Sequence, residues 1–298
     1  MKSILQLVGH TPMVDIQKVI QQPRIRVLAK LEGHNPGGSV KDRAAYGMIK
    51  GALDRGDINP QTRLIEATSG NTGIALAMIA AQFGINITLV MPASATKERV
   101  QTMQAYGATV VLTPAEKTIE YSREYAEDKV NNEGYFMLNQ FANPDNWGMH
   151  YRSTGPEIWK DTEGKVTHFV SSMGTTGTIM GVSRYLKEQN PEVQIVGVQP
   201  TDGSRIPGIR RWSPEFLPQI FEPQRVDQII DVSQEEATAM MLRLAKEESI
   251  FSGMSSGGAI CAAAKLAAQL EGEALIACII CDRGDRYLSS GLFEQSED

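Results

Sequence analysis

The stretch Arg63–Phe83, RLIEATSGNTGIALAMIAAQF, decides the fold class of this chain. Its first part, Arg63–Ala67, is typical of a short strand, and a glycine-containing turn follows it. From Gly73 to Phe83 the sequence is apolar at nearly every position, as expected for a buried helix. A strand that passes through a glycine turn into a buried helix is the repeating unit of an α/β fold.

The same alternation recurs along the chain. Further strands are predicted at Ile85–Met91, Ala108–Leu112, Thr167–Ser171, Gln194–Val198 and Ala274–Cys281, and further helices at Ser94–Tyr106, Ala115–Asn131, Ile179–Lys187, Gln234–Glu247 and Gly258–Leu270. Strands separated by helical crossovers pair in parallel, with helices on both faces of the sheet. Two such series, before and after about Asn143, predict two α/β units.

Composition and charge exclude several classes of function. The chain has 298 residues, of which 42% are hydrophobic and 21% charged, as in ordinary globular proteins. Its net charge of −6 argues against nucleic-acid binding. We find no secretory signal at the N-terminus and no apolar run near the roughly 18 residues that span a membrane. Three cysteines without disulfide spacing suit a reducing compartment, so we expect a cytoplasmic protein.

A metal site is not expected. Cys278 and Cys281 form a C-x-x-C pattern, but they lie in a predicted strand, where a spacing of three places side chains on opposite faces. The four histidines are far apart in the sequence and match no ligand spacing.

Three glycine-rich turns precede helices, where α/β proteins bind ligands. The turn Thr68–Gly73 (TSGNTG) offers backbone N–H groups and hydroxyls to a carboxylate, although a helix cap uses the same residue types. The turn Gly174–Thr178 (GTTGT) suits a phosphate, but it matches neither a nucleoside triphosphate loop nor a dinucleotide fingerprint. The turn Gly253–Gly258 (GMSSGG) fits a ligand or close helix packing equally well.

Lys41 is the candidate catalytic residue. It follows the sequence NPGGSV at the start of a predicted helix, where the positive end of the helix dipole disfavours the charged ammonium. Most lysines are solvated surface groups, so the context matters. A phosphate cradle, a carboxylate cradle and a lysine in this position together indicate a Schiff-base cofactor that carries a phosphate.

Several segments, in order and spacing, resemble the fold-type II pyridoxal-phosphate enzymes. These segments are KLEGHNPGGSVKDR, EATSGNTGIALA, SSMGTTGT, GMSSGGA and CDRGDRYLSSGLF. From about Ile4 to Phe293 the chain is similar to the cysteine synthases (O-acetylserine sulfhydrylases). PGIRRW at Pro207–Trp212, the neighbouring EFLP and CDRGDRY bring it closest to the B-type, or S-sulfocysteine synthase, group.

The resemblance implies a tryptophan synthase β-like fold: two open, twisted, mostly parallel sheets flanked by helices. It also implies a homodimer. Residues 36–145 would form a smaller, mobile substrate-loop domain, and residues 1–35 with 146–298 a larger domain that binds pyridoxal 5′-phosphate.

The matching motifs also imply residue roles. Lys41 would form the Schiff base with the cofactor and later remove the substrate Cα proton. The remaining cofactor ligands would be Asn71 at the 3′-oxygen, Gly174, Thr175, Thr176, Gly177 and Thr178 at the phosphate, and Ser255 and Cys281 as the two family positions considered for the pyridine nitrogen. The substrate carboxylate would be bound by Thr68, Ser69, Thr72 and Gln140.

The implied reaction is a β-replacement. O-acetylserine loses its Cα proton and acetate, leaving an α-aminoacrylate, to which sulfide or thiosulfate adds to give cysteine or S-sulfocysteine. A thiol or hydroxyl does not hold the pyridine nitrogen charged as a carboxylate would, which favours expulsion of a good β-leaving group. Asp282 is expected on the other face of the strand and is discounted as the partner of this nitrogen.

Arg210 and Arg211, beside Trp212, are candidate ligands of thiosulfate, because two guanidinium groups can neutralise a dianion. The alternative is a solvated loop with one arginine in a surface ion pair.

Two other functions remain open. The chain could be another enzyme of this fold, such as a cystathionine β-synthase or a serine or threonine dehydratase, although its length disfavours forms with regulatory domains. It could also be an inactive protein that sequesters cofactor or docks a serine acetyltransferase, against which the intact Lys41 and substrate loop argue. The sequence does not decide between O-acetylserine and O-phosphoserine.

Overall fold

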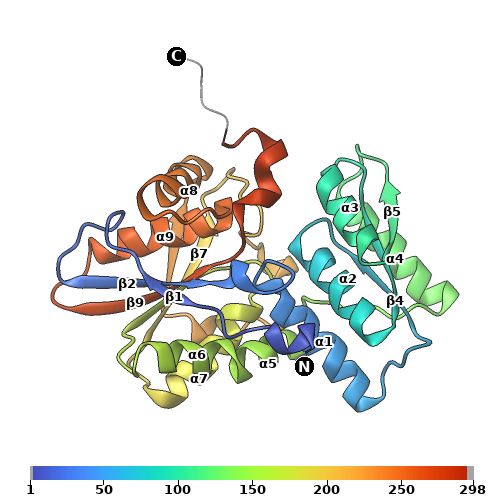
Figure 1. Cartoon of the computed structure of the whole chain (residues 1–298), viewed down its shortest axis with the longest axis horizontal. Helices are drawn as coiled ribbons and strands as arrows, with labels where there is room; N and C mark the ends of the chain where they lie inside the picture. Colours follow the sequence, from blue (N-terminus) through green and yellow to red (C-terminus); the bar gives the residue numbers. More distant parts are fainter. Residues whose placement is uncertain (1–2, 294–298) are drawn as a thin grey trace. The chain divides into compact units, whose positions relative to one another are not determined.

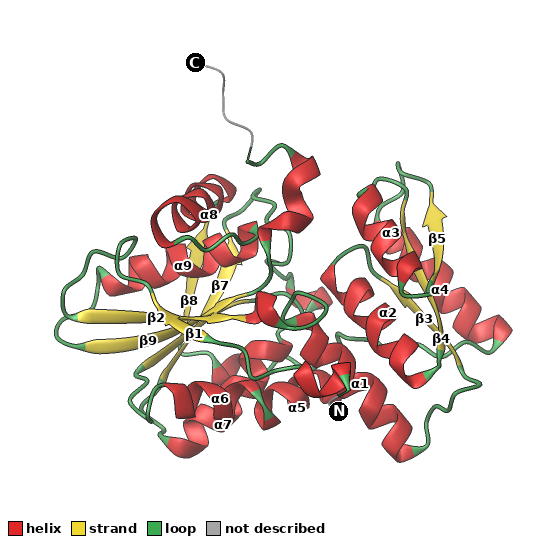
Figure 2. Cartoon of the chain, in the orientation of Figure 1, coloured by secondary structure: helices red, strands yellow, loops and turns green. Residues whose placement is uncertain are grey.

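The computed structural model describes residues 3–293 and divides the chain into two compact units. The smaller unit contains the residues up to Val8 and Lys41–Asn146, and the larger contains Gly9–Val40 and the chain from Trp147 onwards. Each unit has its own sheet (Figures 1 and 2). Each also has its own hydrophobic core. No helix in the part of the chain that the structure describes is long and apolar enough to cross a membrane.

The smaller unit is built on a parallel sheet of three strands. Their order is β3 (Arg63–Ala67), β4 (Asn86–Pro92) and β5 (Thr109–Thr113). The helices α1 (Lys41–Arg55), α2 (Asn71–Phe83) and α3 (Lys97–Ala105) share a core with one face of this sheet, and α4 (Ile119–Glu133) packs on the other. The helix α2 is buried from Thr72 to Ala80 and ends where Gly84 adopts a left-handed φ of 65°.

The larger unit contains a six-stranded sheet. Its order is β1 (Met13–Asp15), β2 (Ile25–Leu31), β9 (Ala274–Ile280), β6 (His168–Ser172), β7 (Gln194–Pro200) and β8 (Gln228–Val232). All neighbouring pairs are parallel except β1 with β2.

Helices cover both faces of the larger sheet. The helices α8 (Gln234–Glu248) and α9 (Met254–Ala267) cover one face, while α6 (Thr154–Asp161), α7 (Gly177–Gln189) and Trp147 of α5 (Pro144–Arg152) pack on the other. Short 3-10 helices lie at Ile4–Leu7, Glu32–His34, Pro214–Phe216, Pro223–Arg225 and Gly284–Ser290. The predicted class, two mostly parallel sheets flanked by helices, is confirmed.

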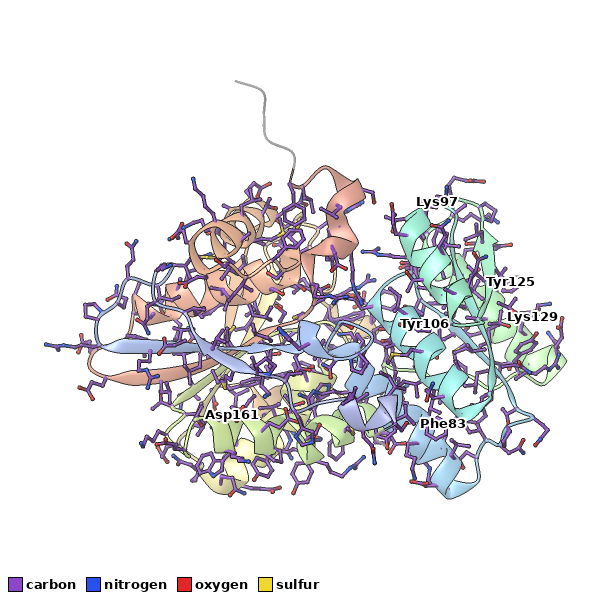
Figure 3. All side chains as sticks on the ribbon, in the orientation of Figure 1. Phe83, Lys97, Tyr106, Tyr125, Lys129 and Asp161 are labelled. Carbon is purple, nitrogen blue, oxygen red and sulfur yellow. The ribbon has the colours of Figure 1, made fainter. Side chains whose placement is uncertain are left out.

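The strand β2 was not among the predicted elements, and its charged residues explain why. Lys30 interrupts the apolar pattern, yet its side chain is fully buried and forms ion pairs with Glu157 at 3.0 Å and Asp161 at 3.2 Å. Asp161 lies on α6 (Figure 3). A buried lysine is tolerated when it is paired, but its partners are more than a hundred residues away in the sequence.

Candidate active site

Two parallel neighbours, β6 and β9, bring distant parts of the sequence to one edge of the larger sheet. The turn Gly174–Thr178 follows β6, and Cys281 follows β9 directly. The first turn of α9 joins them, because the hydroxyl of Ser172 donates to the carbonyl of Ser255 (2.8 Å) and the N–H of Cys281 donates to the hydroxyl of Ser256 (2.9 Å). The structure therefore brings Ser255, Cys281 and the predicted phosphate turn together within one unit.

The turn Gly174–Thr178 has the features of a phosphate site. It leads into the 13-residue helix α7, whose N-terminal N–H groups favour an anion. Thr176 has a left-handed φ of 70°, and its hydroxyl oxygen is buried without a hydrogen-bond partner in residues 3–293. Such an unpartnered donor at a helix N-terminus fits a cofactor phosphate.

The segment around Gly208 packs against the phosphate turn. The N–H of Arg210 donates to the carbonyl of Met173 (2.8 Å), and the indole N–H of Trp212 donates to the carbonyl of Gly174 (2.9 Å). A side chain at Gly174 would bring Cβ to 2.7 Å from the carbonyl oxygen of Gly208, so the approach requires glycine at position 174.

His150 also belongs to this region, and the sequence analysis missed it. It is buried, its Nδ1 lies 2.8 Å from the hydroxyl of Thr154, and its Nε2 lies 3.4 Å from the hydroxyl of Thr178. The contact holds a predicted phosphate ligand in place. It joins α5 to α7, and no local pattern in the sequence indicates it.

The two cysteines of the C-x-x-C pattern pack on opposite faces of the sheet. Cys278 lies in the core shared with α9, whereas Cys281 packs against the core beneath α6 and α7. Burial raises the pKa of the Cys278 thiol. The described residues contain no cluster of side chains that could hold a metal ion.

Asp282, next to Cys281, has a structural role. It is almost fully buried, and its carboxylate accepts hydrogen bonds from the N–H of Gly253 (3.1 Å) and the hydroxyl of Tyr287 (2.5 Å). These bonds tie the start of α9 to the chain that follows β9.

The smaller unit assembles the residues predicted to bind a carboxylate. Thr68, Ser69 and Gly70 join β3 to α2, which begins at Asn71. The hydroxyl of Thr72 donates to Oε1 of Gln140 (2.9 Å), and both side chains are buried. With Oε1 engaged, the Nε2 amide of Gln140 is the end of the side chain that would donate to an anion. These donors beside a helix N-terminus fit a carboxylate.

Glu66 lies on β3 (RLIEA), the strand that leads into this turn, and the sequence analysis did not single it out. Its carboxylate accepts a hydrogen bond from the N–H of Asn139 at 3.2 Å. A charged residue in a buried strand was the signal that could have identified it.

Lys41 is the first residue of α1, as predicted, and it is partly buried. The preceding residue, Val40, donates its N–H to the carbonyl of Cys281 (2.8 Å). The lysine therefore follows a backbone segment that is hydrogen-bonded to the end of β9.

The two adjacent arginines differ in their surroundings. Arg211 forms ion pairs with Asp202 (3.2 Å) and Asp231 and donates to the carbonyl of Pro200 (2.9 Å). The guanidinium carbon of Arg210 lies 5.7 Å from the centre of the Trp212 ring. Arg211 therefore anchors its loop, and Arg210 is the better candidate to meet a small anion.

Comparisons with known proteins agree with this geometry. The family model described as "Pyridoxal-phosphate dependent enzyme" matches residues 4–282. Cysteine synthase B of Pseudomonas aeruginosa is 58% identical over 98% of this chain and 97% of its own length, and cysteine synthase B of Escherichia coli K12 is 52% identical over 98% and 96%. A crystal structure of a cysteine synthase from Entamoeba histolytica superposes with a TM-score of 0.93 at 37% identity, covering 100% of this chain and 92% of that one.

The matches extend over nearly the whole chain and include all the segments that form the predicted site. The chain therefore belongs to the pyridoxal-phosphate-dependent enzymes and, within them, to the cysteine synthases.

Proposed function

We propose that this chain makes L-cysteine from O-acetyl-L-serine and sulfide by β-replacement. The observation that carries the proposal is the phosphate turn before α7, where the buried hydroxyl of Thr176 has no hydrogen-bond partner among the described residues. The relatives named cysteine synthase B, at 52% and 58% identity, supply the reaction class.

The residues present fit the cofactor. Pyridoxal phosphate, when bound, withdraws electrons from the substrate amino acid and so weakens its Cα–H bond and the bond to its β-substituent. Gly174–Thr178 would hold the phosphate, Asn71 the 3′-oxygen, and Lys41 the aldehyde carbon. The amine of Lys41 is also the proposed base that takes the proton from Cα of the substrate.

The substrate carboxylate would lie at the N-terminus of α2. Thr68, Ser69 and Thr72 supply hydroxyls there, and Gln140 supplies an amide that Thr72 already orients. These donors would fix the amino acid so that its Cα proton faces the base. As an extension of the proposal, the Thr68–Thr72 turn moves inward when substrate binds, making the smaller unit the mobile domain.

Ser255 and Cys281 are proposed as the neighbours of the pyridine nitrogen. Neither a hydroxyl nor a thiol stabilises a positive charge there as a carboxylate would, which favours elimination of acetate over racemisation. Asp282 follows Cys281 directly in the chain, but its carboxylate accepts hydrogen bonds from Gly253 and Tyr287.

Arg210 is proposed to bind thiosulfate, the alternative sulfur donor that would give S-sulfocysteine. A guanidinium group pairs with an oxyanion through charge-assisted hydrogen bonds. Arg211 would act indirectly, because its ion pairs with Asp202 and Asp231 hold the loop that carries Arg210.

The visible absorption spectrum of the purified protein tests the core proposal. Wild type should be yellow, and its absorption band should shift when O-acetylserine is added. Lys41→Ala should lose both the covalent attachment of the cofactor and turnover, whereas Lys50→Ala, a partly exposed lysine of the same helix that pairs with Asp54, should retain both. A colourless wild type that takes up no pyridoxal phosphate would refute the proposal and favour a non-catalytic binding protein.

Turnover with the two sulfur donors tests the role of Arg210. We expect Arg210→Ala to lower kcat/KM for thiosulfate about 10- to 100-fold, the loss of one or two charge-assisted bonds, with little effect on sulfide. Equal losses with both donors would contradict a role in recognising thiosulfate.

Two further parts of the proposal concern the whole protein. We propose a homodimer, as the family resemblance implies, which sedimentation at several concentrations would test. We also propose a cytoplasmic location, because none of the three cysteines forms a disulfide.

A further inference from the structure

Glu66 of β3 is a buried carboxylate, 4% exposed, that accepts a hydrogen bond from a turn of backbone. Its Oε2 accepts the N–H of Asn139 at 3.2 Å, and the backbone N–H groups of Leu138 and Gln140 also stabilise the charge. Asn139 has a left-handed φ of 55°. One left-handed residue lets consecutive N–H groups converge on a single anion, as in an anion-binding nest.

The turn held in this way carries Gln140. Side chains also hold its carbonyl groups, because Asn143 donates to the carbonyl of Leu138 (2.8 Å) and Asn146 donates to the carbonyl of Gln140 (2.8 Å). The Gln140 side chain then meets Thr72 at 2.9 Å. The conformation of the turn therefore decides where the Gln140 amide points.

We propose that Glu66 is a positioning residue whose ionised carboxylate fixes the Leu138–Gln140 turn and thereby holds Gln140 against Thr72 for the substrate carboxylate. The inference rests on the proposed function of Gln140. Glu66 itself need not touch the substrate.

The charge of this carboxylate is sensitive to pH near neutrality. Burial raises the pKa of Glu66 to about 7, and the three N–H groups and Arg123 oppose that shift. Arg123 lies on α4, the helix that packs on β3, and its guanidinium carbon is 5.1 Å from the ring centre of Phe141. On the other side, β4 places Leu89 beside Glu66.

Lys129, the other basic residue of α4, lies 5.3 Å from the ring centre of Tyr125 and pairs with Glu133. Figure 3 labels Tyr125 and Lys129 on this helix. Arg123 is therefore the cation that acts on Glu66 from this helix.

Protonation would loosen the turn. A neutral carboxyl turns one oxygen into a donor and so satisfies fewer N–H groups. The free energy of unfolding should change in the opposite direction and increase on protonation. The reason is that a pKa raised above its ordinary value in the folded state makes the folded protein less stable with the carboxylate charged. The contribution of this group to stability is complete below its ordinary pKa and is lost as the pH rises toward 7.

Hydrogen exchange tests the proposal without relying on turnover. In the cofactor-loaded protein, Glu66→Gln should speed exchange of the Asn139 and Gln140 amides about tenfold at pH 8, as expected for one lost charge-assisted hydrogen bond. The amides of β4 should not change. Glu124→Gln, an exposed carboxylate on α4, is the control and should alter neither set.

The unfolding temperature and the pH dependence of amide protection provide two further tests of the same proposal. Because the variant removes a buried charge, its unfolding temperature at pH 8 should equal or exceed that of wild type. In wild type, protection of the two amides, corrected for intrinsic exchange, should fall as the pH is lowered through about 7, and Glu66→Gln should abolish that dependence. Unchanged protection in Glu66→Gln would overturn the proposal.

Kinetics show whether Glu66 acts through Gln140. Glu66→Gln should raise KM for O-acetylserine about five- to tenfold, with little change in kcat, and should add almost nothing to Gln140→Ala in the double variant. Additive effects would refute the proposed route.

The outcomes of these experiments distinguish a failure of the positioning role of Glu66 from a failure of the proposed function. If Gln140→Ala raises KM and Glu66→Gln does not, the positioning role is wrong and the proposed function stands. If wild type shows no turnover, the function fails, and exchange still decides the role of Glu66 in the turn. Should Glu66→Gln not fold, Glu66→Asp, one methylene shorter, should show the same gain in exchange, and normal protection there would overturn the proposal.

Discussion

At the scale of single residues, Thr176 carries two costs that its own unit does not offset. Its buried hydroxyl lacks a hydrogen-bond partner in the described part of the chain, which costs about 1–3 kcal/mol. A β-branched residue at a φ of 70° adds strain of about 1–3 kcal/mol. Both features fit a position that binds a ligand. A bound phosphate would satisfy the hydroxyl and recover part of this free energy.

Because the buried hydroxyl is unfavourable without a ligand, we expect Thr176→Ala to have opposite effects on the protein with and without cofactor. Without pyridoxal phosphate, the unfolding temperature should be unchanged or higher, because an unsatisfied hydroxyl is removed. With cofactor, affinity should fall about tenfold, the value of one hydrogen bond to a charged group. Calorimetry and cofactor titration measure both quantities.

Thr96 supplies the matched control, since its hydroxyl lies at the N-terminus of α3 and is also buried without a partner among the residues that the structure describes. Thr96→Ala should leave cofactor affinity unchanged. Equal loss of affinity in the two variants would show that Thr176 acts only through the fold.

The sequence predicted the residues in glycine-rich motifs and missed those that act through tertiary contacts. The turns at Thr68–Gly73 and Gly174–Thr178 were visible because glycines and hydroxyls before a helix form a local pattern. Glu66 and His150 act through partners 73 and 28 residues away, Asn139 and Thr178. A contact of that kind has no local signature.

At the scale of elements, the turn Gly253–Gly258 opens a helix that packs closely on its neighbour. Gly257 lies in the first turn of α9, and a Cβ there would collide with the carbonyl of Ala237 and approach the N–H of Met241 to 2.8 Å. Both atoms belong to the backbone of α8, which cannot move aside as a side chain can. Close helix packing, one of the two interpretations left open by the sequence, therefore explains Gly257.

Two neighbouring glycines in this turn should respond differently to substitution. Gly257→Ala should destabilise the protein by at least about 1–3 kcal/mol, the range for overpacking a core. Gly258→Ala would instead meet the end of the Ile209 side chain at 2.9 Å, which can rotate, and should cost less. Urea unfolding of the two variants measures the difference. Equal stabilities would contradict a backbone collision at Gly257.

Element boundaries were predicted well for two strands, β3 and β9. The strand β3 matches its predicted range, and β9 ends one residue earlier than expected. The helix α9 begins four residues before the predicted start, because Met254–Gly257 are already helical and the glycines there suggested a turn. Tertiary packing overrides the low helix propensity of glycine in this case.

At the scale of the whole molecule, the alternating pattern predicted parallel sheets but not the order of their strands. The N-terminal strand β2 lies between β1 and the C-terminal strand β9, with Ile25 opposite Ala274. That pairing joins residues 249 positions apart in the sequence (274 − 25), and nothing local encodes it. It also explains why Gly9–Val40 belong to the same unit as Cys281.

The three cysteines should differ in reactivity across the molecule. Cys261 and Cys278 are buried, and burial raises the pKa of both thiols, so little thiolate is available to react. Cys281 is partly exposed at the edge where β9 ends. In native protein without cofactor, a thiol reagent such as 5,5′-dithiobis(2-nitrobenzoate) should therefore modify one thiol rapidly and two only on unfolding.

Cofactor should protect the fast thiol, because the proposed position of the pyridine nitrogen lies beside Cys281. We expect the rate to fall at least about tenfold when pyridoxal phosphate is bound, since access controls thiol reactivity. Cys281→Ser should remove the fast phase and retain cofactor, as a hydroxyl can occupy the same position. A fast phase that persists in Cys281→Ser would assign the reactive thiol to Cys261 or Cys278. An unprotected Cys281 would mean that the cofactor ring lies away from the end of β9, and the proposed role of this thiol in favouring elimination would then be wrong.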